Sequence, residues 1–496
     1  MKRRLEEFIR KLLSNENIEF TDKNKDILSD FAEDEDNISA MQIIIGHQEE
    51  LKKRIMSKLR IFEIQNQHIQ IPNATVGKEY SAHIDFIKLG FDDFIYTDFE
   101  GLEDKNLVYD NSSETIFGIP NQSGDFKIKL KFRISGEAED SELNFKNISL
   151  VINADPKSLW KNLPSDKQDE FWKEDDVFCY STLGEKSIII ASKRGRSHAN
   201  VGSFRDDDYS FKHFDKTGWS LVAVSDGAGS AKFSRKGSEV ACKEVVNYFD
   251  TQLSQELTEN FDHLLENYTG ELKKLEKINN ENEPENHIDE EFNLIKDCTA
   301  QYQNEISKFI YNNLGGCARA VHSKLEKFAL TNNFDIKDLH STLIFSLFKK
   351  YEFGYVILSF GVGDCPIGIL DKDCSSFKLM NWLDVGEYGG GTRFITMPEI
   401  FVSDKFSTRF GFKILDDFSY LMLMTDGIYD AKFVVESNLE KLEKWQEFIL
   451  DLKGNNEDKV KIDFDNRNID SAQQLSKWMD FWSPGNHDDR TLAIIY

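Results

Sequence analysis

The spacing of hydrophobic and polar positions changes along this chain of 496 residues, and each spacing predicts a different kind of structure. Residues 1–60 repeat apolar positions at intervals of three and four, which indicates amphipathic helices. Residues 61–152 alternate apolar and polar positions in short runs, which is typical of a small antiparallel β-sandwich. Residues 153–178 are expected to be a linker that aromatic residues pin to a neighbouring domain. In residues 179–496 strand-like runs alternate irregularly with long helical stretches, which favours an α+β fold over a parallel βαβ sheet.

Two helices are expected in the first region. The apolar face of the first helix consists of Leu5, Phe8, Ile9, Leu12 and Leu13. The second helix is predicted from Ile38 to Leu59, and five of its residues are expected to face inward: Met41, Ile44, Ile45, Leu51 and Ile55. The favoured interpretation is that the first helix packs on the rest of the protein. Binding to a membrane surface is the alternative, because the polar face of this helix is rich in Lys and Arg.

Seven apolar runs in the last region predict strands, namely 187–192, 219–224, 341–349, 354–361, 366–370, 420–424 and 490–496. Three stretches have helical periodicity, namely 236–250, 253–280 and 288–330. The polar segment 279–286 is rich in Asn and Glu and contains a Pro, so it predicts a turn between helices.

Composition narrows the classes of partner. The chain has 87 acidic and 61 basic residues and a formal net charge of -26. Its negative electrostatic field repels phosphate backbones, which argues against nucleic acid as a binding partner. The acidic excess is also explained by solubility alone. The sequence has 40% apolar and 12% aromatic residues, which is ample material for two or three buried cores.

The chain is expected to be cytoplasmic. Its six cysteines show no C-x-x-C pair, which is typical of reduced thiols in a cytosolic protein. The basic N-terminus is not followed by the apolar segment of a secretion signal, and no stretch approaches the ~18 apolar residues of a membrane span.

Acidic residues at the ends of predicted strands carry the candidate chemistry. The apolar run 219–224 leads into Asp226-Gly227, and the run 420–424 leads through Thr425 into Asp426-Gly427. Further acidic sites lie at 206–208, at Asp364 and at 488–489. Each motif alone fits an ordinary turn or helix cap, whereas five in a similar context indicate a shared site. Carboxylates that converge without histidines or thiolates favour Mg²⁺ or Mn²⁺ over Zn²⁺.

The order of these motifs resembles that of the metal-dependent type 2C serine/threonine protein phosphatases, and of a bacterial subgroup in particular. The resemblance rests on Arg194-Gly195-x-Ser197-His198, Asp207-Asp208, Asp226-Gly227-Ala228-Gly229-Ser230, Ser341-Thr342, Gly363-Asp364, Thr425-Asp426-Gly427-Ile428-Tyr429-Asp430, Asp488-Asp489-Arg490-Thr491 and the loop 386–396. It spans roughly 179–496 and implies a four-layer sandwich of two antiparallel sheets flanked by helices. In addition, 71–80 and 117–126 resemble immunoglobulin-like modules of bacterial multidomain proteins.

The resemblance also implies a set of metal ligands. Asp226 would bridge two Mg²⁺ or Mn²⁺ ions, with the Gly227 carbonyl on one ion and Asp426 and Asp488 on the other. Asp207 and Asp208 would complete the ion near Gly227, directly or through water. Asp364 and Asp430 fall where the family has an additional, weaker metal site. A hydroxide between the two ions would then attack the phosphorus of a phosphoserine or phosphothreonine in line.

Two positions depart from the family pattern. Ala228 stands where eukaryotic relatives have a histidine that protonates the leaving group, so His198 or bound water is the candidate acid. Ser203 stands where many relatives have a phosphate-binding arginine, so Arg205 and Arg194 are the candidate substitutes.

Three classes of function therefore remain open. The favoured one is a phosphoprotein phosphatase whose substrate is a phosphorylated protein, with a partner kinase as one candidate. The second is a phosphatase-fold scaffold or phosphopeptide-binding module with little activity. The third is a hydrolase of nucleotides or other small phosphoesters.

Overall fold

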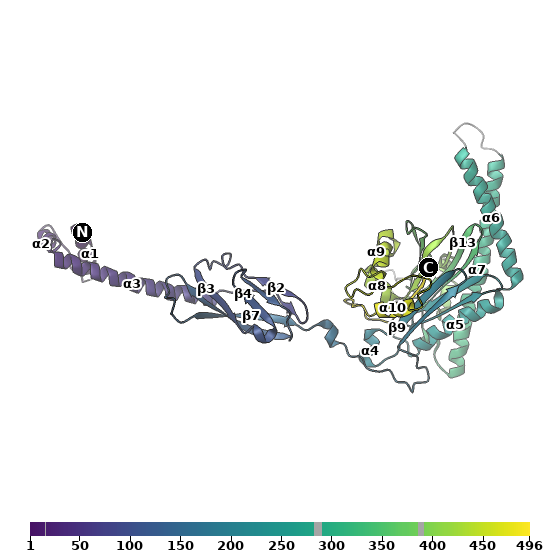
Figure 1. Ribbon diagram of the computed structural model, residues 1–496, viewed down its shortest axis with the longest axis horizontal. Helices are drawn as coiled ribbons and strands as arrows, with labels where there is room; N and C mark the ends of the chain where they lie inside the picture. The colour runs from purple at the N-terminus through teal and green to yellow at the C-terminus, as the bar shows by residue number, and fades with distance from the viewer. Residues whose placement is uncertain (15, 282–289, 385–390) are drawn as a thin grey trace. The chain divides into compact units, whose positions relative to one another are not determined.

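A computed structural model describes residues 1–14, 16–281, 290–384 and 391–496 (Figure 1). Its contacts divide the chain into two compact units, Met1–Leu159 and Trp160–Tyr496. The boundary falls inside the predicted linker, so most of that segment belongs to the second unit. Residues 282–286 of the predicted turn and residues 386–390 of the loop 386–396 lie outside the described residues. Among the residues described, no helix has the length and apolar character needed to cross a membrane.

The first unit begins with three helices: α1 (Lys2–Ser14), α2 (Lys25–Phe31) and α3 (Glu35–Asn66). The Asp34 side chain caps α3 by accepting a hydrogen bond from the Asp36 amide at 2.8 Å. α1 packs on the N-terminal part of α3, where Leu5 and Met41 are buried. Beyond that contact α3 continues alone, so the prediction that Ile44, Leu51 and Ile55 face inward was wrong.

A β-sandwich completes the first unit. Its larger sheet has the order β1-β7-β6-β3, and its smaller sheet has the order β2-β5-β4. The strands are β1 (Ala74–Thr75), β2 (Tyr80–His83), β3 (Phe94–Glu100), β4 (Leu107–Asp110), β5 (Thr115–Gly118), β6 (Gly124–Ile134) and β7 (Asn144–Asn153). Alternate residues of β6 are buried, and they share one core with Leu107 and Ile116 of the smaller sheet. The likeness to immunoglobulin modules stays a prediction.

The second unit contains two larger sheets in which all strand pairs are antiparallel. The five-stranded sheet consists, in order, of β10 (Asp208–Phe214), β11 (Trp219–Ser225), β12 (Leu343–Tyr351), β13 (Gly354–Val362) and β16 (Phe410–Leu415). The six-stranded sheet consists of β15 (Phe377–Leu379), β14 (Ile367–Asp371), β17 (Phe418–Met424), β18 (Arg490–Ile495), β9 (Lys186–Lys193) and β8 (Asp176–Leu183). Apolar side chains from both sheets form one core between them, including Ile190, Val222 and Leu421.

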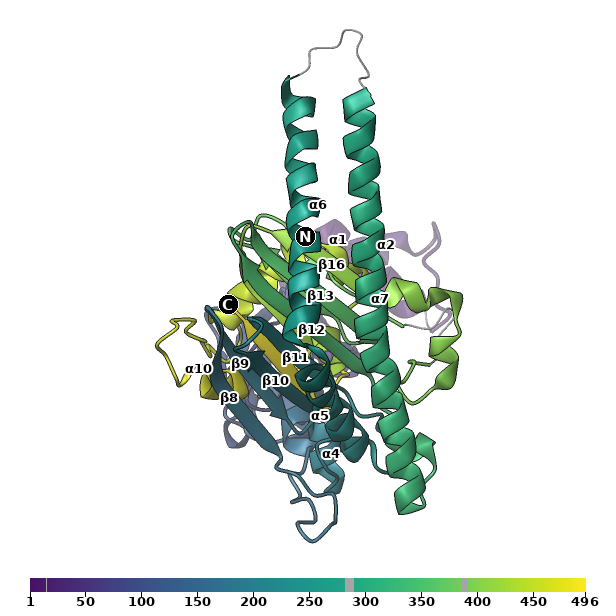
Figure 2. The same ribbon diagram turned by 90° about the vertical axis from the view of Figure 1, so that its right-hand side faces the viewer.

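Helices pack on each sheet of the second unit. α5 (Ser234–Gln252), α6 (Gln255–Glu281) and α7 (Glu290–Asn332) share a core with the five-stranded sheet. α8 (Asp426–Phe433), α9 (Leu442–Leu452) and α10 (Ser471–Trp478) share a core with the six-stranded sheet, and the short α4 (Arg196–Val201) follows β9. Figure 2 shows that α6 and α7 run side by side and extend beyond the sheets. The predicted α+β class is confirmed, and all seven predicted strands and three predicted helices are present.

Candidate metal centre

Five chain segments bring carboxylates together where strands of the two sheets begin or end. β11 ends at Ser225, directly before Asp226. In the other sheet β17 ends at Met424, and Asp426 then begins α8. The pair 488–489 precedes β18, 206–207 precedes β10, and Asp364 follows β13. These positions are far apart in the sequence, and they become neighbours only because the two sheets pack against each other.

The electrostatics show that these carboxylates act on one another. Burial raises the pKa of Asp226 well above its ordinary value, and four further charges raise it more: Asp426, Asp207, Asp488 and Asp364. Burial raises the pKa of Asp426 as well, and the charges that add to the effect are those of Asp488, Asp364, Asp207 and Asp430. Mutual repulsion of this kind favours a bound cation, because a divalent ion neutralises several carboxylates at once.

Asp207 is held in place with one oxygen left over. The hydroxyls of Thr425 and Thr491 donate to its Oδ2 at 2.9 and 2.8 Å. Its Oδ1 is buried and has no hydrogen-bond partner, and burial together with the charge of Asp489 raises the pKa of Asp207 to about 7. Asp364 repeats this arrangement, since Thr392 donates to Oδ2 at 2.7 Å and the buried Oδ1 has no partner.

These two unpartnered oxygens test whether the residues fit a metal ion. A buried polar atom without a partner is costly, so its persistence calls for an explanation. Divalent cations with oxygen ligands supply one, because Mg²⁺ and Mn²⁺ bind carboxylate and carbonyl oxygens. The donor set therefore fits a hard divalent ion. The Cys365 thiol near Asp226 and Asp364 does not change this, since burial raises its pKa well above the ordinary value and keeps it neutral.

Two glycines let the segments approach closely. A Cβ on Gly227 would lie 2.6 Å from the carbonyl oxygen of Asp206, and a Cβ on Gly427 would collide with the carbonyl oxygen of Asp489. Any side chain at either position would push the carboxylate-bearing loops apart. The Asp-Gly pairs are thus explained by backbone contact as well as by ligand chemistry.

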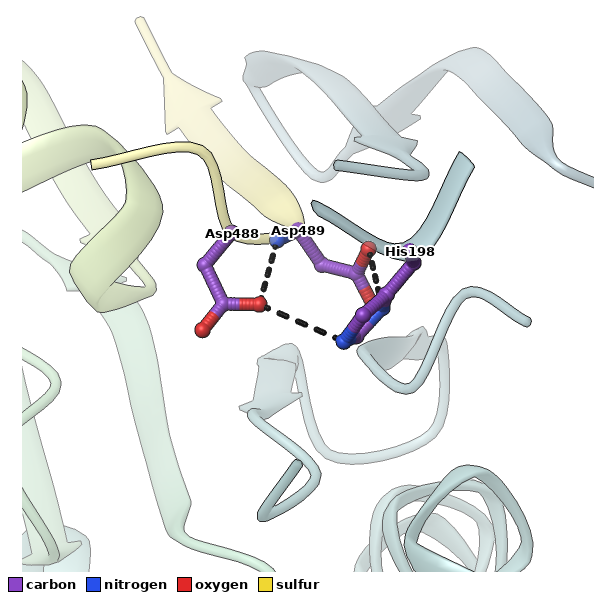
Figure 3. A group of neighbouring side chains, drawn as sticks. All are labelled: His198, Asp488 and Asp489. Atoms are coloured by element: carbon purple, nitrogen blue, oxygen red, sulfur yellow. Dashed lines mark hydrogen bonds and ion pairs between the residues drawn. The ribbon is translucent and has the colours of Figure 1, made fainter. Parts of the chain in front are cut away.

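His198 and Asp489 form a buried pair beside Asp488 (Figure 3). The His198 Nδ1 lies 3.0 Å from Asp489 Oδ1, and its Nε2 lies 3.7 Å from Asp488 Oδ1. Burial lowers the pKa of His198, but the charges of Asp489, Asp206 and Asp488 outweigh it and raise the pKa to about 10. Asp489 also accepts the amide of Gly195 at 2.6 Å and the amide of Asp206. Asp489 therefore ties the loop after β9 to the loop before β10 and keeps the imidazole protonated at neutral pH.

The family model for Protein phosphatase 2C matches residues 194–480, which is more than half of the chain. The chain belongs to the protein phosphatase 2C family. The match covers the segments that carry His198, Asp207, Asp226, Asp364 and Asp426.

Solved structures and curated proteins add little to the protein phosphatase 2C assignment. The serine/threonine phosphatase Stp1 from Staphylococcus aureus is 15% identical, with 64% of this chain and 95% of that chain covered and a TM-score of 0.31. The catalytic domain of PstP, a serine threonine protein phosphatase in complex with two manganese ions, is 12% identical over 64% and 98% of the chains, with a TM-score of 0.34. No curated protein matches the chain.

The structure gives this protein phosphatase 2C chain a different use for the two predicted phosphate-binding arginines. Arg205 donates from Nη1 to the carbonyl of Asp207 at 2.6 Å and from Nε to the carbonyl of Glu174 at 2.9 Å. Arg194 donates to the carbonyls of Ser203 and Leu163 at 2.8 and 2.9 Å. Both guanidinium groups are buried and bound to backbone, so neither is free to bind a substrate phosphate here. They hold the loops of the site together instead.

Asp208 also differs from its predicted place among the metal ligands. Its Oδ2 lies 3.0 Å from the Nζ of Lys173, with which it forms a largely buried ion pair. Burial raises the pKa of Asp208, but the charges of Lys173 and Arg205 outweigh this effect and lower it. The two neighbouring side chains have different partners: Asp208 begins β10 and meets Lys173, whereas Asp207 precedes the strand and is held by Thr425 and Thr491. Asp430 stays close to the other carboxylates and accepts a hydrogen bond from Asn486 at 3.3 Å.

Several residues support the site in roles that the sequence analysis did not assign to them. Thr425, Thr491 and Asp489 stand next to predicted ligands, so their adjacency was a usable signal. Lys173 gave no such signal, because it lies in the predicted linker. Its Nζ donates to the Asp207 carbonyl at 2.6 Å and to the Arg235 carbonyl at 3.2 Å, so it braces the loop from which Asp207 reaches the site.

Proposed function

We propose that residues 160–496 form a metal-dependent phosphoprotein phosphatase that hydrolyses phosphoserine and phosphothreonine on a protein substrate. The observation that carries the proposal is the cluster of mutually repelling, buried carboxylates with unpartnered oxygens on Asp207 and Asp364. A scaffold or a phosphopeptide reader has no need of such a cluster, which costs stability until cations bind. Membership of the protein phosphatase 2C family supports the same reaction class.

The residues would hold two divalent ions as follows. Asp226 would bridge them, the carbonyl of Gly227 and Asp207 would serve one ion, and Asp426 and Asp488 the other. Asp364 and Asp430 could serve a third, weaker site. When bound, Mg²⁺ or Mn²⁺ supplies an activated water and neutralises the charge of the phosphoryl group. The protein fixes the ligands in advance: the Thr425 and Thr491 hydroxyls orient Asp207, and the backbone clamps of Arg205 and Lys173 hold its loop.

His198 is the proposed proton donor for the leaving alkoxide. Asp489 orients the ring through Nδ1, which leaves the Nε2 proton on the side of Asp206 and Asp488. The ring lies on α4, in the loop region that Arg194 clamps, so its position is fixed before substrate arrives. Replacing His198 by Asn should lower kcat most for substrates with poor leaving groups, such as phosphothreonine peptides, and least for p-nitrophenyl phosphate.

The decisive assay measures phosphate release from a phosphothreonine peptide with Mn²⁺ present. Asp226→Asn should abolish release, whereas Asp215→Asn should not, because the Asp215 side chain is 98% exposed at the turn after β10. Comparison with nucleotides tests the small-molecule alternative, which a faster rate on nucleotides would support. Metal and phosphopeptide binding in calorimetry without turnover on any substrate would support the scaffold alternative.

A further inference from the structure

The long helix α3 presents an apolar stripe that its own unit leaves uncovered. α1 packs only on its N-terminal part, and the β-sandwich packs only on its C-terminal end, through Ile61 and Ile64 (Figure 1). Between these contacts Leu51 is 64% exposed and Ile55 is 53% exposed, and Phe62, which lies between the contact residues Ile61 and Ile64, is still 64% exposed. Side chains of this size are rarely left in water in a row unless another surface covers them.

The stripe has the periodicity of a coiled coil. Ile44, Leu51 and Lys58 are spaced by seven residues, and so are Gln48, Ile55 and Phe62, with four residues between the two series. They are the d and a positions of a heptad repeat, and at 1.5 Å per residue they extend over about 27 Å of the helix. Seven-residue spacing keeps such a stripe facing a partner helix when the two helices wrap around each other in a left-handed supercoil. The natural partner of this surface is therefore another helix.

The pattern of apolar and polar positions along the stripe is the same in both directions of the helix. Counted from position 53, Ile55 mirrors Leu51, Lys58 mirrors Gln48 and Phe62 mirrors Ile44. Two copies of the helix placed antiparallel about that centre therefore match each apolar side chain with an apolar one and each polar side chain with a polar one. This self-complementarity is what a two-fold interface between identical chains requires.

The charges along the helical region support the antiparallel direction. In an antiparallel pair centred at position 53, residues 56–66 of one helix face residues 40–50 of the other. Residues 56–66 carry two Lys or Arg and one Glu, whereas residues 40–50 carry Glu49 and Glu50 and no Lys or Arg. An antiparallel pair therefore places segments of opposite net charge beside each other, whereas a parallel pair places each segment beside its own copy, with the same charge. Arg54 is already balanced by Glu50 on its own helix, with which it forms an ion pair.

We propose that α3 pairs with α3 of a second copy of this chain, antiparallel and centred near position 53, and thereby makes the protein a dimer. The proposal does not depend on the enzymatic activity, because every residue that carries it lies in the first unit. It gives the helical region a role in assembly, with the consequence that each assembly carries two C-terminal units.

The mass of the full-length chain in solution tests the pairing. Sedimentation equilibrium at about 1–100 µM should give twice the mass of one chain. Leu51→Glu combined with Ile55→Glu should give single chains, with unchanged helix content by circular dichroism, since both side chains are exposed in one copy. Met56→Glu is the matched control, because Met56 is 58% exposed but lies outside the stripe, and this variant should remain a dimer.

Cross-linking tests the direction. Chains with Ile44→Cys mixed with chains with Phe62→Cys should form a disulfide-linked pair under mild oxidation, whereas neither variant alone should do so. The unmodified chain, oxidised in parallel, controls for its six natural cysteines. A single-chain mass at all concentrations, or a dimer that survives Leu51→Glu with Ile55→Glu, would overturn the proposal. So would efficient linkage of Ile44→Cys with itself, or binding of the stripe to anionic lipid vesicles by a single chain.

Discussion

Lys173 offers a sharp test of how the site is built, because it braces Asp207, a proposed metal ligand, without being a proposed ligand itself. Its Nζ donates to the carbonyl of Asp207 at 2.6 Å and pairs with Asp208 at 3.0 Å. The two charged side chains are only 13% and 18% exposed, so solvent cannot replace the lost partner. Lys173→Met keeps the length of the chain but removes the ammonium group, and it leaves Asp208 as an uncompensated buried charge.

The expected cost is about 3–5 kcal/mol of unfolding free energy, which is the usual penalty for breaking a buried ion pair from one side. Urea denaturation of the metal-free protein measures it. A second variant, Asp208→Asn, removes the stranded charge, so the double variant should cost about 1–3 kcal/mol less than the sum of the two single variants. Strict additivity, or a cost below about 0.5 kcal/mol for Lys173→Met, would refute the bracing role.

Measuring the affinity for metal distinguishes a role of Lys173 in positioning Asp207 from a contribution to stability alone. Because Lys173 holds the Asp207 carbonyl, its loss should weaken Mn²⁺ binding by about 10- to 100-fold, as for other groups that orient metal ligands. Calorimetry on the folded variant measures this independently of turnover. Lys432→Met is a matched control, since Lys432 forms a similar ion pair with Asp451 at 2.8 Å among the helices of the six-stranded sheet. It should lower stability without changing the affinity for Mn²⁺.

Three further results are expected. Asp226→Asn should abolish turnover. It should also stabilise the metal-free protein by about 1–3 kcal/mol, because it removes one of several repelling buried charges. A melting temperature below that of the parent protein would contradict this expectation. Arg205→Ala should lower both the unfolding free energy and kcat, because the carbonyls of Glu174 and Asp207 lose their hydrogen-bond donor, and it should leave KM for a phosphopeptide unchanged. A rise in KM alone would show that Arg205 binds the substrate phosphate. Removal of metal with EDTA should lower the melting temperature by several degrees, and Mn²⁺ at about 100 times its Kd should add back about 2.7 kcal/mol; equal melting curves would exclude a tight metal site.

Local patterns in the sequence located many strands and helices of the second unit and the positions of the candidate metal ligands along the chain. Strand periodicity located β9, β11 to β14, β17 and β18, and helical periodicity located α5 to α7. Asp226 and Asp426 could be singled out because each lies within two residues of the end of a buried strand and precedes a glycine. These features depend on neighbours in the chain, so they can be read without knowledge of the fold.

Only the tertiary structure decided which side chains support the site and which turn away from it. Asp207 receives its hydrogen bonds from Thr425 and Thr491, which lie more than 200 residues further along the chain. Arg205 and Lys173 looked like a phosphate binder and a linker residue, but burial against backbone carbonyls makes both of them structural braces. Leu51 and Ile55 have the spacing of a buried helix face, yet both are exposed. Spacing shows that a face is apolar, but it does not show whether another element covers that face. Contacts between distant segments set these roles, because hydrogen bonding and burial depend on distance in space, which the order of residues does not contain.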